Sequence, residues 1–180
     1  MVVLLATYFF SFAGFCHQEE PSILDFEIKE DLLSIKIQTY LEVLSAVELN
    51  KFDLKNSYNF DKTIKDSEKI SRNAAIVKLV FQNWSLIRTK FFFNANQVPL
   101  DLKLINVEIS SMNSHSDTMV LFVRIDARVP HGSDFITFSW DENLGDLVIR
   151  EQGNNGNLYS DYLVRGAMSS KIYLQKKSFN

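Results

Sequence analysis

The feature that most constrains this fold is the alternation of apolar and polar residues near the start of the chain. Within Ser22 to Lys29, positions 24, 26 and 28 are apolar and positions 25, 27 and 29 are charged. The alternation returns from Ile35 to Val43, after Glu30-Asp31. A period of two indicates strands with one buried face. We therefore expect an antiparallel hairpin with one face on a core and one in water.

Further strands are expected in the rest of the chain, where Gly, Asn, Asp and Pro mark the turns. The expected strands are 86–93, 100–109, 119–129, 134–140, 147–152, 158–164 and 171–175. Strands at a spacing of about 8–12 residues are typical of a sandwich or barrel. The sequence predicts a mainly β fold, an antiparallel β-sandwich of immunoglobulin-like type. It forms a single domain over residues 17–175, followed by a tail at 176–180.

One helix is expected to interrupt the strands, over about residues 61–84. Apolar residues occur there at the spacing of one helical face: Ile70, Ala74, Val77, Phe81 and Trp84. The alternative for this region is another apolar strand over 75–81.

Composition fits a globular domain and excludes several classes of protein. The chain has 180 residues, of which 46% are hydrophobic and 23% charged, a balance that can form a core. A net charge of −3 argues against nucleic-acid binding, which normally needs a basic face. A single cysteine excludes an internal disulfide framework and any multi-cysteine metal site.

Residues 1–16 are predicted to be a signal peptide. The first charged side chain is Glu19, and the apolar run before it is shorter than the roughly 20 residues of a membrane-spanning helix. Gly14-Phe15-Cys16 offers a small-x-small cleavage site, although the usual Lys or Arg at the start is missing. A short uncleaved anchor, a truncated gene start and a buried first element remain as alternatives. A signal peptide implies a periplasmic or extracellular location.

The sequence contains no recognisable catalytic motif. It lacks the nucleophile elbow, the phosphate-binding loop, the dinucleotide fingerprint and the H-E-x-x-H zinc motif. The adjacent carboxylates Asp141 and Glu142 are expected on a solvated turn, where neighbouring side chains point apart. We therefore expect a protein that is not an enzyme and has no bound cofactor.

His17 is the one candidate metal ligand. If the leader is removed after Cys16, its α-amine and imidazole can bind one ion together, and imidazole suits copper and nickel. The alternative is an exposed, unliganded terminus.

The aromatic residues on the expected strands are assigned mainly to the core. They are Phe122, Phe135, Phe138, Trp140, Tyr159 and Tyr162. The alternative is a sugar- or protein-binding platform with several of them exposed on one face. Within the triplet 91–93, a strand turns Phe92 away from its neighbours, toward the helix or a partner.

Residues 138–150 contain the most distinctive motif, which has a structural explanation of its own. Trp140 ends a strand, Asp141 is expected to bond turn amides, and Gly145 to supply a positive φ angle. Arg150 is expected to pair with an acidic residue such as Asp141 or Asp161. Together these residues predict a hairpin that needs no ligand.

The same stretch resembles a known family. Phe138-Ser139-Trp140-Asp141, then 144–150 (LGDLVIR) and 159–166 (YSDYLVRG), are similar to the soluble N-terminal region of HupE/UreJ-like membrane proteins, relatives of nickel permeases. The resemblance implies an extracytoplasmic β-rich domain that precedes a multi-helix membrane half. The chain ends at Asn180 without such a half, so we expect a membrane-protein partner or a missing membrane half.

These observations lead to one main functional hypothesis and two alternatives. The main hypothesis is an exported, non-enzymatic β-sandwich that acts as a periplasmic accessory or sensing module for a HupE/UreJ-like membrane protein. The alternatives are a small metal-binding protein that uses His17, and a carbohydrate- or protein-binding sandwich with exposed aromatic residues.

Overall fold

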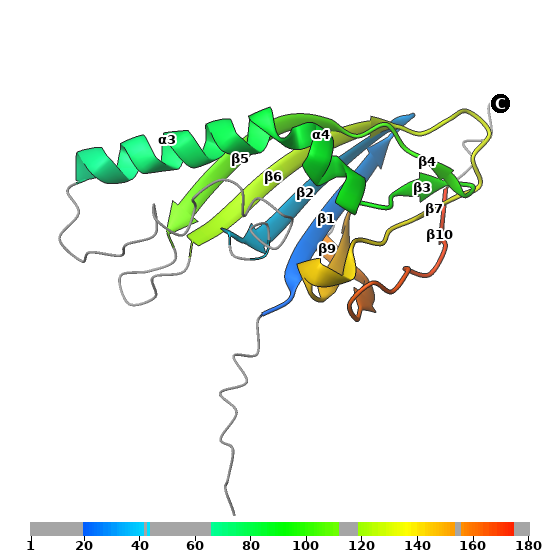
Figure 1. Ribbon diagram of the computed structural model, residues 1–180. Coiled ribbons are helices and arrows are strands. Elements are labelled where there is room, and N and C mark those ends of the chain that lie inside the picture. The colour runs from blue at the N-terminus through cyan, green and yellow to red at the C-terminus, as the bar shows by residue number, and fades with distance from the viewer. Residues whose placement is uncertain (1–19, 42, 44–65, 112–118, 154–155, 175–180) are drawn as a thin grey trace, which may run out of the picture.

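The computed structural model describes residues 20–41, 43, 66–111, 119–153 and 156–174 (Figure 1). The predicted signal peptide, the expected helix start at 61–65 and the tail at 176–180 lie outside these residues, as do His17 and His115.

The larger of two sheets has six strands in the order β5-β6-β2-β1-β8-β9. They are β1 (Ser22–Lys29), β2 (Leu32–Tyr40), β5 (Lys103–Ser111), β6 (Met119–Arg128), β8 (Leu147–Gly153) and β9 (Gly156–Leu163). Neighbouring strands are antiparallel except β1 and β8, which run parallel. This pair brings an early and a late segment of the chain side by side within the sheet.

The smaller sheet has the order β10-β7-β3-β4, and helical segments lie beside it. Its strands are β3 (Asn94–Ala95), β4 (Val98–Pro99), β7 (Phe135–Thr137) and β10 (Ile172–Tyr173). The helices are α3 (Asp66–Gln82) and α4 (Trp84–Ile87), with 3-10 turns η2 (Arg88–Lys90) and η3 (Glu142–Leu144). The prediction of a mainly β, sandwich-like fold with one helical insertion is confirmed.

The first hairpin forms as its alternation predicts. Strand β1 has the predicted limits, and β2 pairs with it so that Leu24 faces Ile37 and Phe26 faces Ile35. All four side chains are at most 1% exposed. The turn between the strands places Glu30 at a φ of 61°. Local alternation therefore determined both the strands and the face that is buried.

The core lies between one face of the six-stranded sheet and a second layer made of the helices and the smaller sheet (Figure 1). Aromatic rings connect the layers: Phe138 lies 5.1 Å from Phe26 in β1 and 5.1 Å from Phe93, measured between ring centroids. Phe91 stacks on Phe93 at 5.5 Å and lies 6.4 Å from Trp140. Burial of such large rings makes a major contribution to the stability of the sandwich.

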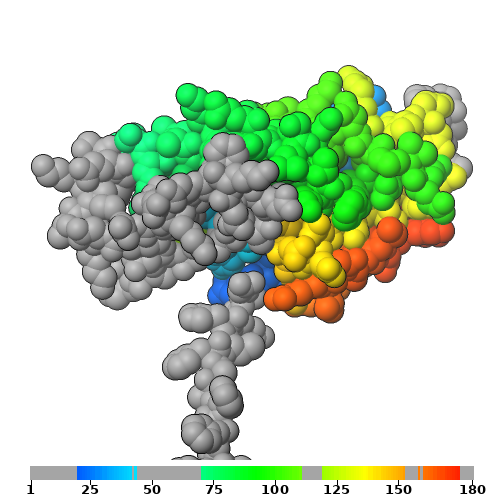
Figure 2. Space-filling model, viewed as in Figure 1, coloured from blue at the N-terminus to red at the C-terminus, as the bar shows by residue number. Residues whose placement is uncertain are grey.

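The helix is present, but the face predicted for it is only partly correct, since Val77 and Trp84 pack against the core while the other predicted members are exposed. Ile76 and Val80 enter the core, whereas Ile70 is 70% and Phe81 45% exposed. Figure 2 shows α3 along the top of the molecule, with part of its surface open to solvent. The helix carries two overlapping apolar stripes, and packing against β5 selected the one that contains Ile76. The alternative strand over 75–81 is wrong.

The strand predicted over 86–93 is also wrong, because 84–90 is helical. Ile87 is buried in the core and Trp84 packs against it, and the Trp84 indole Nε1 donates to the carbonyl of Leu102 at 3.2 Å. This burial at helical spacing outweighs the strand preference of the Phe triplet that follows. Phe92 is 47% exposed between buried Phe91 and Phe93, as predicted.

Candidate functional site

The six-stranded sheet has a second face, which points away from the core and which we call the open face. Its central residues come from β5, β6, β2 and β1, and all but one of them are polar: Asp25, Glu27, Ser34, Lys36, Asn106, Glu108, Phe122 and Arg124. They alternate along each strand with buried core residues, which is the pattern of a sheet with one wet face. Lys36, Glu108 and Arg124 are exposed.

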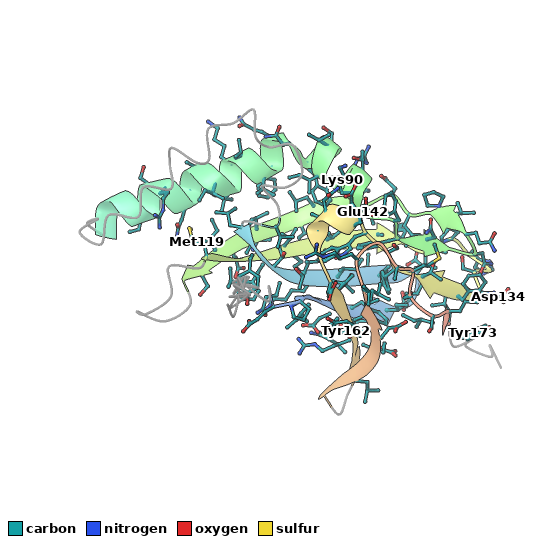
Figure 3. The ribbon with its side chains drawn as sticks, turned by 60° about the horizontal axis from the view of Figure 1, so that its bottom comes forward. Lys90, Met119, Asp134, Glu142, Tyr162 and Tyr173 are labelled. Carbon is teal, nitrogen blue, oxygen red and sulfur yellow. The ribbon has the colours of Figure 1, made fainter. Side chains whose placement is uncertain are left out.

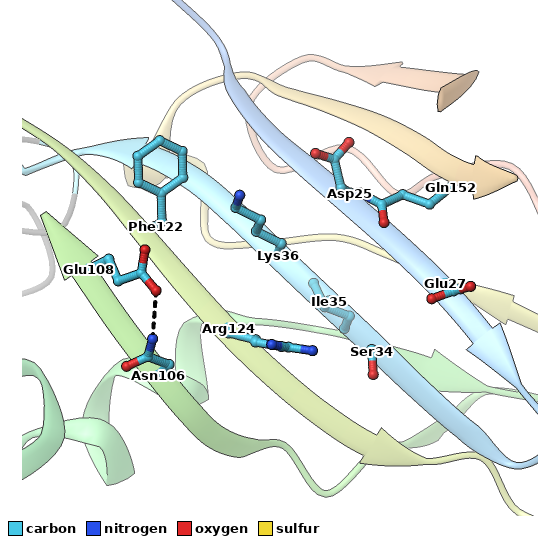
Figure 4. Close-up of a pocket in the computed structure, with 10 residues that line it drawn as sticks. All are labelled: Asp25, Glu27, Ser34, Ile35, Lys36, Asn106, Glu108, Phe122, Arg124 and Gln152. Carbon is cyan, nitrogen blue, oxygen red and sulfur yellow. Dashed lines mark hydrogen bonds between the residues drawn. The ribbon is translucent and has the colours of Figure 1, made fainter. Parts of the chain in front are cut away.

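These residues line a shallow hollow of about 210 Å³ (Figure 4). Figure 4 shows Lys36 extending between Phe122 and Asp25, while Arg124 extends toward Ser34 on the other side of the hollow. The Lys36 Nζ lies 4.8 Å from the Phe122 ring centroid, a cation–π contact. The hollow therefore presents an aromatic ring and charges of both signs.

Arg150 and Asp25 form a bidentate ion pair at the edge of the hollow. The Arg150 Nε donates to Asp25 Oδ1 at 2.7 Å, and Nη2 donates to Oδ2 at 2.8 Å. These hydrogen bonds raise the pKa of Arg150 above its ordinary value. The expected partners of Arg150, Asp141 and Asp161, are wrong. The parallel pairing of β1 with β8 places Asp25 directly opposite Arg150, which no local pattern could indicate.

The motif residues Trp140, Asp141 and Gly145 do form a structural turn. Trp140 is buried, and its Nε1 donates to the Gly145 carbonyl at 2.9 Å. Asp141 accepts from the Asn143 amide at 3.0 Å, and Gly145 has a φ of 79°. The predicted roles of Asp141 and Gly145 are confirmed. The predicted hairpin is wrong, because β7 ends at Thr137 and belongs to the smaller sheet, whereas β8 belongs to the larger one, and Trp140 forms only an isolated bridge with Phe91.

Asp141 also ties this turn to the helical layer. Lys90 Nζ donates to Asp141 Oδ2 at 2.9 Å, and Figure 3 shows Lys90 beside Glu142 where η2 meets η3. The Lys90 ammonium, together with the Asn143 amide, lowers the pKa of Asp141 below its ordinary value. Sequence reasoning missed this ion pair because the two residues are 51 positions apart.

The aromatic residues predicted for the core divide between the core and the open face. Phe138 and Trp140 are buried, as predicted. Phe122 borders the hollow and Tyr162 is 44% exposed, so their assignment to the core is wrong. Both lie at open-face positions of their strands, opposite Gln38 and Val148 respectively. The side chain of Tyr159 lies outside the described residues.

The metal hypothesis falls outside the described part of the chain. His17 and Cys16 are not among the described residues, and His131 is exposed in a turn. Among the residues that the structure describes, no three His, Cys, Asp or Glu side chains gather in a group able to hold a metal ion. No described helix is both long and apolar enough to cross a bilayer.

Comparison with known proteins adds no assignment. No protein-family model matches the chain, and no curated protein is similar to it. The fold and the open face therefore define a mainly β protein with a charged, hollowed sheet surface, and the resemblance to HupE/UreJ-like proteins stays a prediction.

Proposed function

We propose that this protein is a non-enzymatic recognition module that binds a charged ligand or partner segment on the open face. The observation that carries the proposal is the hollow itself, in which Lys36, Arg124 and Phe122 are available beside carboxylates that already have donors. Charged and aromatic groups on a rigid sheet bind without any nucleophile or proton shuttle.

The cellular role is the one expected from the sequence, an accessory or sensing module outside the cytosol that serves a membrane partner. Support comes from the uncharged run at the N-terminus and from the resemblance of the 138–150 motif to the soluble region of HupE/UreJ-like proteins. A fusion of residues 1–20 to a reporter that is active only after export tests the location. An inactive fusion would show that residues 1–20 do not direct export and would contradict this part of the proposal.

A carbohydrate is the second candidate ligand, because aromatic side chains contribute to the open face. Tyr40, Phe122 and Tyr162 occupy open-face positions of β2, β6 and β9. Tyr40 and Phe122 are diagonal neighbours on adjacent strands, but Tyr162 lies three strands from β2. A platform of two rings beside several charged groups favours a charged ligand over a stacked sugar.

Amide chemical shifts of the ¹⁵N-labelled full chain provide the test. The probes are an acidic pentapeptide, a basic pentapeptide and a cello-oligosaccharide. We expect one peptide to shift amides of open-face residues such as Lys36 and Arg124, while core amides such as Leu24 stay unchanged. Shifts clustered elsewhere, or none with any probe, would contradict binding on this face, and preferential shifts with the sugar would replace the charged ligand.

A further inference from the structure

Two cations face each other at the centre of the open face. Lys36 in β2 and Arg124 in β6 are direct partners in the strand register. Like charges directly opposite each other on a sheet lower its stability. On its other side Lys36 lies directly opposite Asp25 in β1, whereas the other register partner of Arg124 is the uncharged Asn106. The pairing of the two cations has no structural benefit of its own, which makes Arg124 in particular a candidate for a binding role.

The carboxylates around the two cations are each engaged by another donor. Asp25 is held by Arg150 through two hydrogen bonds, and Glu27 accepts from Lys29 at 2.9 Å. Glu108 accepts from Asn106 at 2.7 Å. Asp126 lies directly opposite Ser34 in the strand register and accepts from the Ser34 hydroxyl at 2.9 Å.

Arg124 is left with its donors unused among the described residues. Its guanidinium makes no hydrogen bond or ion pair there, and Lys36 has only its contact with the Phe122 ring. A guanidinium presents a planar fork that matches a carboxylate, and an ammonium nearby adds a second donor.

We propose that Arg124, assisted by Lys36, binds a carboxylate group of a peptide on the open face. This inference rests on the proposed function and specifies its ligand. A phosphate, with its higher charge, would meet Glu27 and Glu108 in the same hollow, so the charge pattern favours a singly charged group. The Phe122 ring beside Lys36 offers apolar surface to the hydrocarbon part of the ligand.

A titration of the full chain with matched peptides tests the proposal. The probes are acetyl-Gly-Gly-Glu-Gly-Gly-amide, the same peptide with Gln in place of Glu, the Gln peptide with a free C-terminal carboxylate, and the Glu position replaced by phosphoserine. The readout is the side-chain Nε–Hε signal of Arg124 together with the open-face amides. We expect the Glu peptide or the C-terminal carboxylate peptide to bind about tenfold more tightly than the neutral Gln peptide. Whichever of the two binds more tightly identifies the source of the carboxylate.

A double variant, Lys36→Gln with Arg124→Gln, supplies the second arm. The matched control is Lys171→Gln with Arg128→Gln, which removes the same charge; Lys171 also lies over a Phe ring, that of Phe135, at 4.5 Å. We expect the first variant to lose at least about tenfold in affinity and the control to bind like the wild type. The unfolding midpoint of the first variant should be unchanged or higher, which separates lost binding from lost folding.

The outcomes are distinguishable from failure of the proposed function. Equal binding of the Glu and Gln peptides, tighter binding of the phosphoserine peptide, or equal loss in the control variant would overturn the carboxylate site. If another probe still shifts open-face amides, the recognition module stands with a different ligand. If no probe shifts them, both proposals fail.

Discussion

The two faces of the six-stranded sheet are built from the same strands, yet they have opposite characters. On the core face, Leu24, Ile37 and Phe26 are buried and packed against the second layer. On the open face, Asp25, Lys36 and other polar residues alternate with them and line a hollow. The choice of side chains on the core face is constrained by close packing, whereas on the open face it is constrained by solubility and by binding. The difference explains why the fold is readable from the sequence while the ligand is not.

The largest effect should come from truncating the core face. Phe138→Ala removes a fully buried ring that contacts Phe26 and Phe93, and should lower the free energy of unfolding by about 3–5 kcal/mol. The control is Phe122→Ala on the open face, for which we expect a loss of about 1 kcal/mol or less. Urea unfolding followed by circular dichroism measures both. Similar losses in the two variants would show that the open face is packed like a core.

The ion pair at the edge of the hollow should have an intermediate effect. Asp25→Asn leaves the part-buried Arg150 guanidinium without its carboxylate and should lower stability by about 1–2 kcal/mol. Glu27→Gln is the matched control in the same strand, because its ion pair with Lys29 is more exposed and should contribute less than about 0.5 kcal/mol. Thermal unfolding of both variants is the measurement, and a Glu27 variant as unstable as the Asp25 variant would contradict this ranking.

Asp141 should make stability depend on pH in the acid range. Its pKa is lower in the folded state, so its contribution is present above the ordinary carboxyl pKa and is lost as the pH falls through the folded value. Asp141→Asn should therefore lower stability by about 1 kcal/mol near neutral pH and make no difference once the pH lies below the folded pKa. Unfolding midpoints of the wild type and the variant, compared across this range, test the sign.

The neighbouring exposed carboxylate provides the control for Asp141. Glu142→Gln should change the midpoint near neutral pH by the equivalent of less than about 0.5 kcal/mol. A gap between the wild type and the Asp141 variant that widens as the pH falls would contradict the assignment.

The smallest effect, with the opposite sign, is expected on the open face. Lys36→Gln removes the like-charge pair with Arg124 and should leave stability unchanged or raise it by about 0.2–1 kcal/mol. Lys171→Gln is the control, since that lysine also lies over a Phe ring but outside the hollow. Denaturant unfolding gives the comparison, and a clear loss of stability in the Lys36 variant would show that this cation serves the fold.

Much of the fold was predictable where the pattern is local. Strand β1 has its predicted limits, and β2, β6 and β8 lie within a few residues of theirs. The turn at Asp141 and the positive φ of Gly145 followed from residue chemistry. The candidate site was less predictable from the sequence. Arg150 was singled out, but with the wrong partner. Lys36, Arg124 and Phe122 were not recognised as a group, because only the order of the strands brings them together.

The sequence by itself determined most of the strands and, in the first hairpin, which of two faces each side chain occupies, since alternation is a property of neighbouring residues. Only the tertiary structure decided which strands adjoin, which stripe of α3 is buried and that Asp25 meets Arg150 across 125 positions. Those choices depend on packing and hydrogen bonding between distant segments, whose free energies exist only once the two layers have come together.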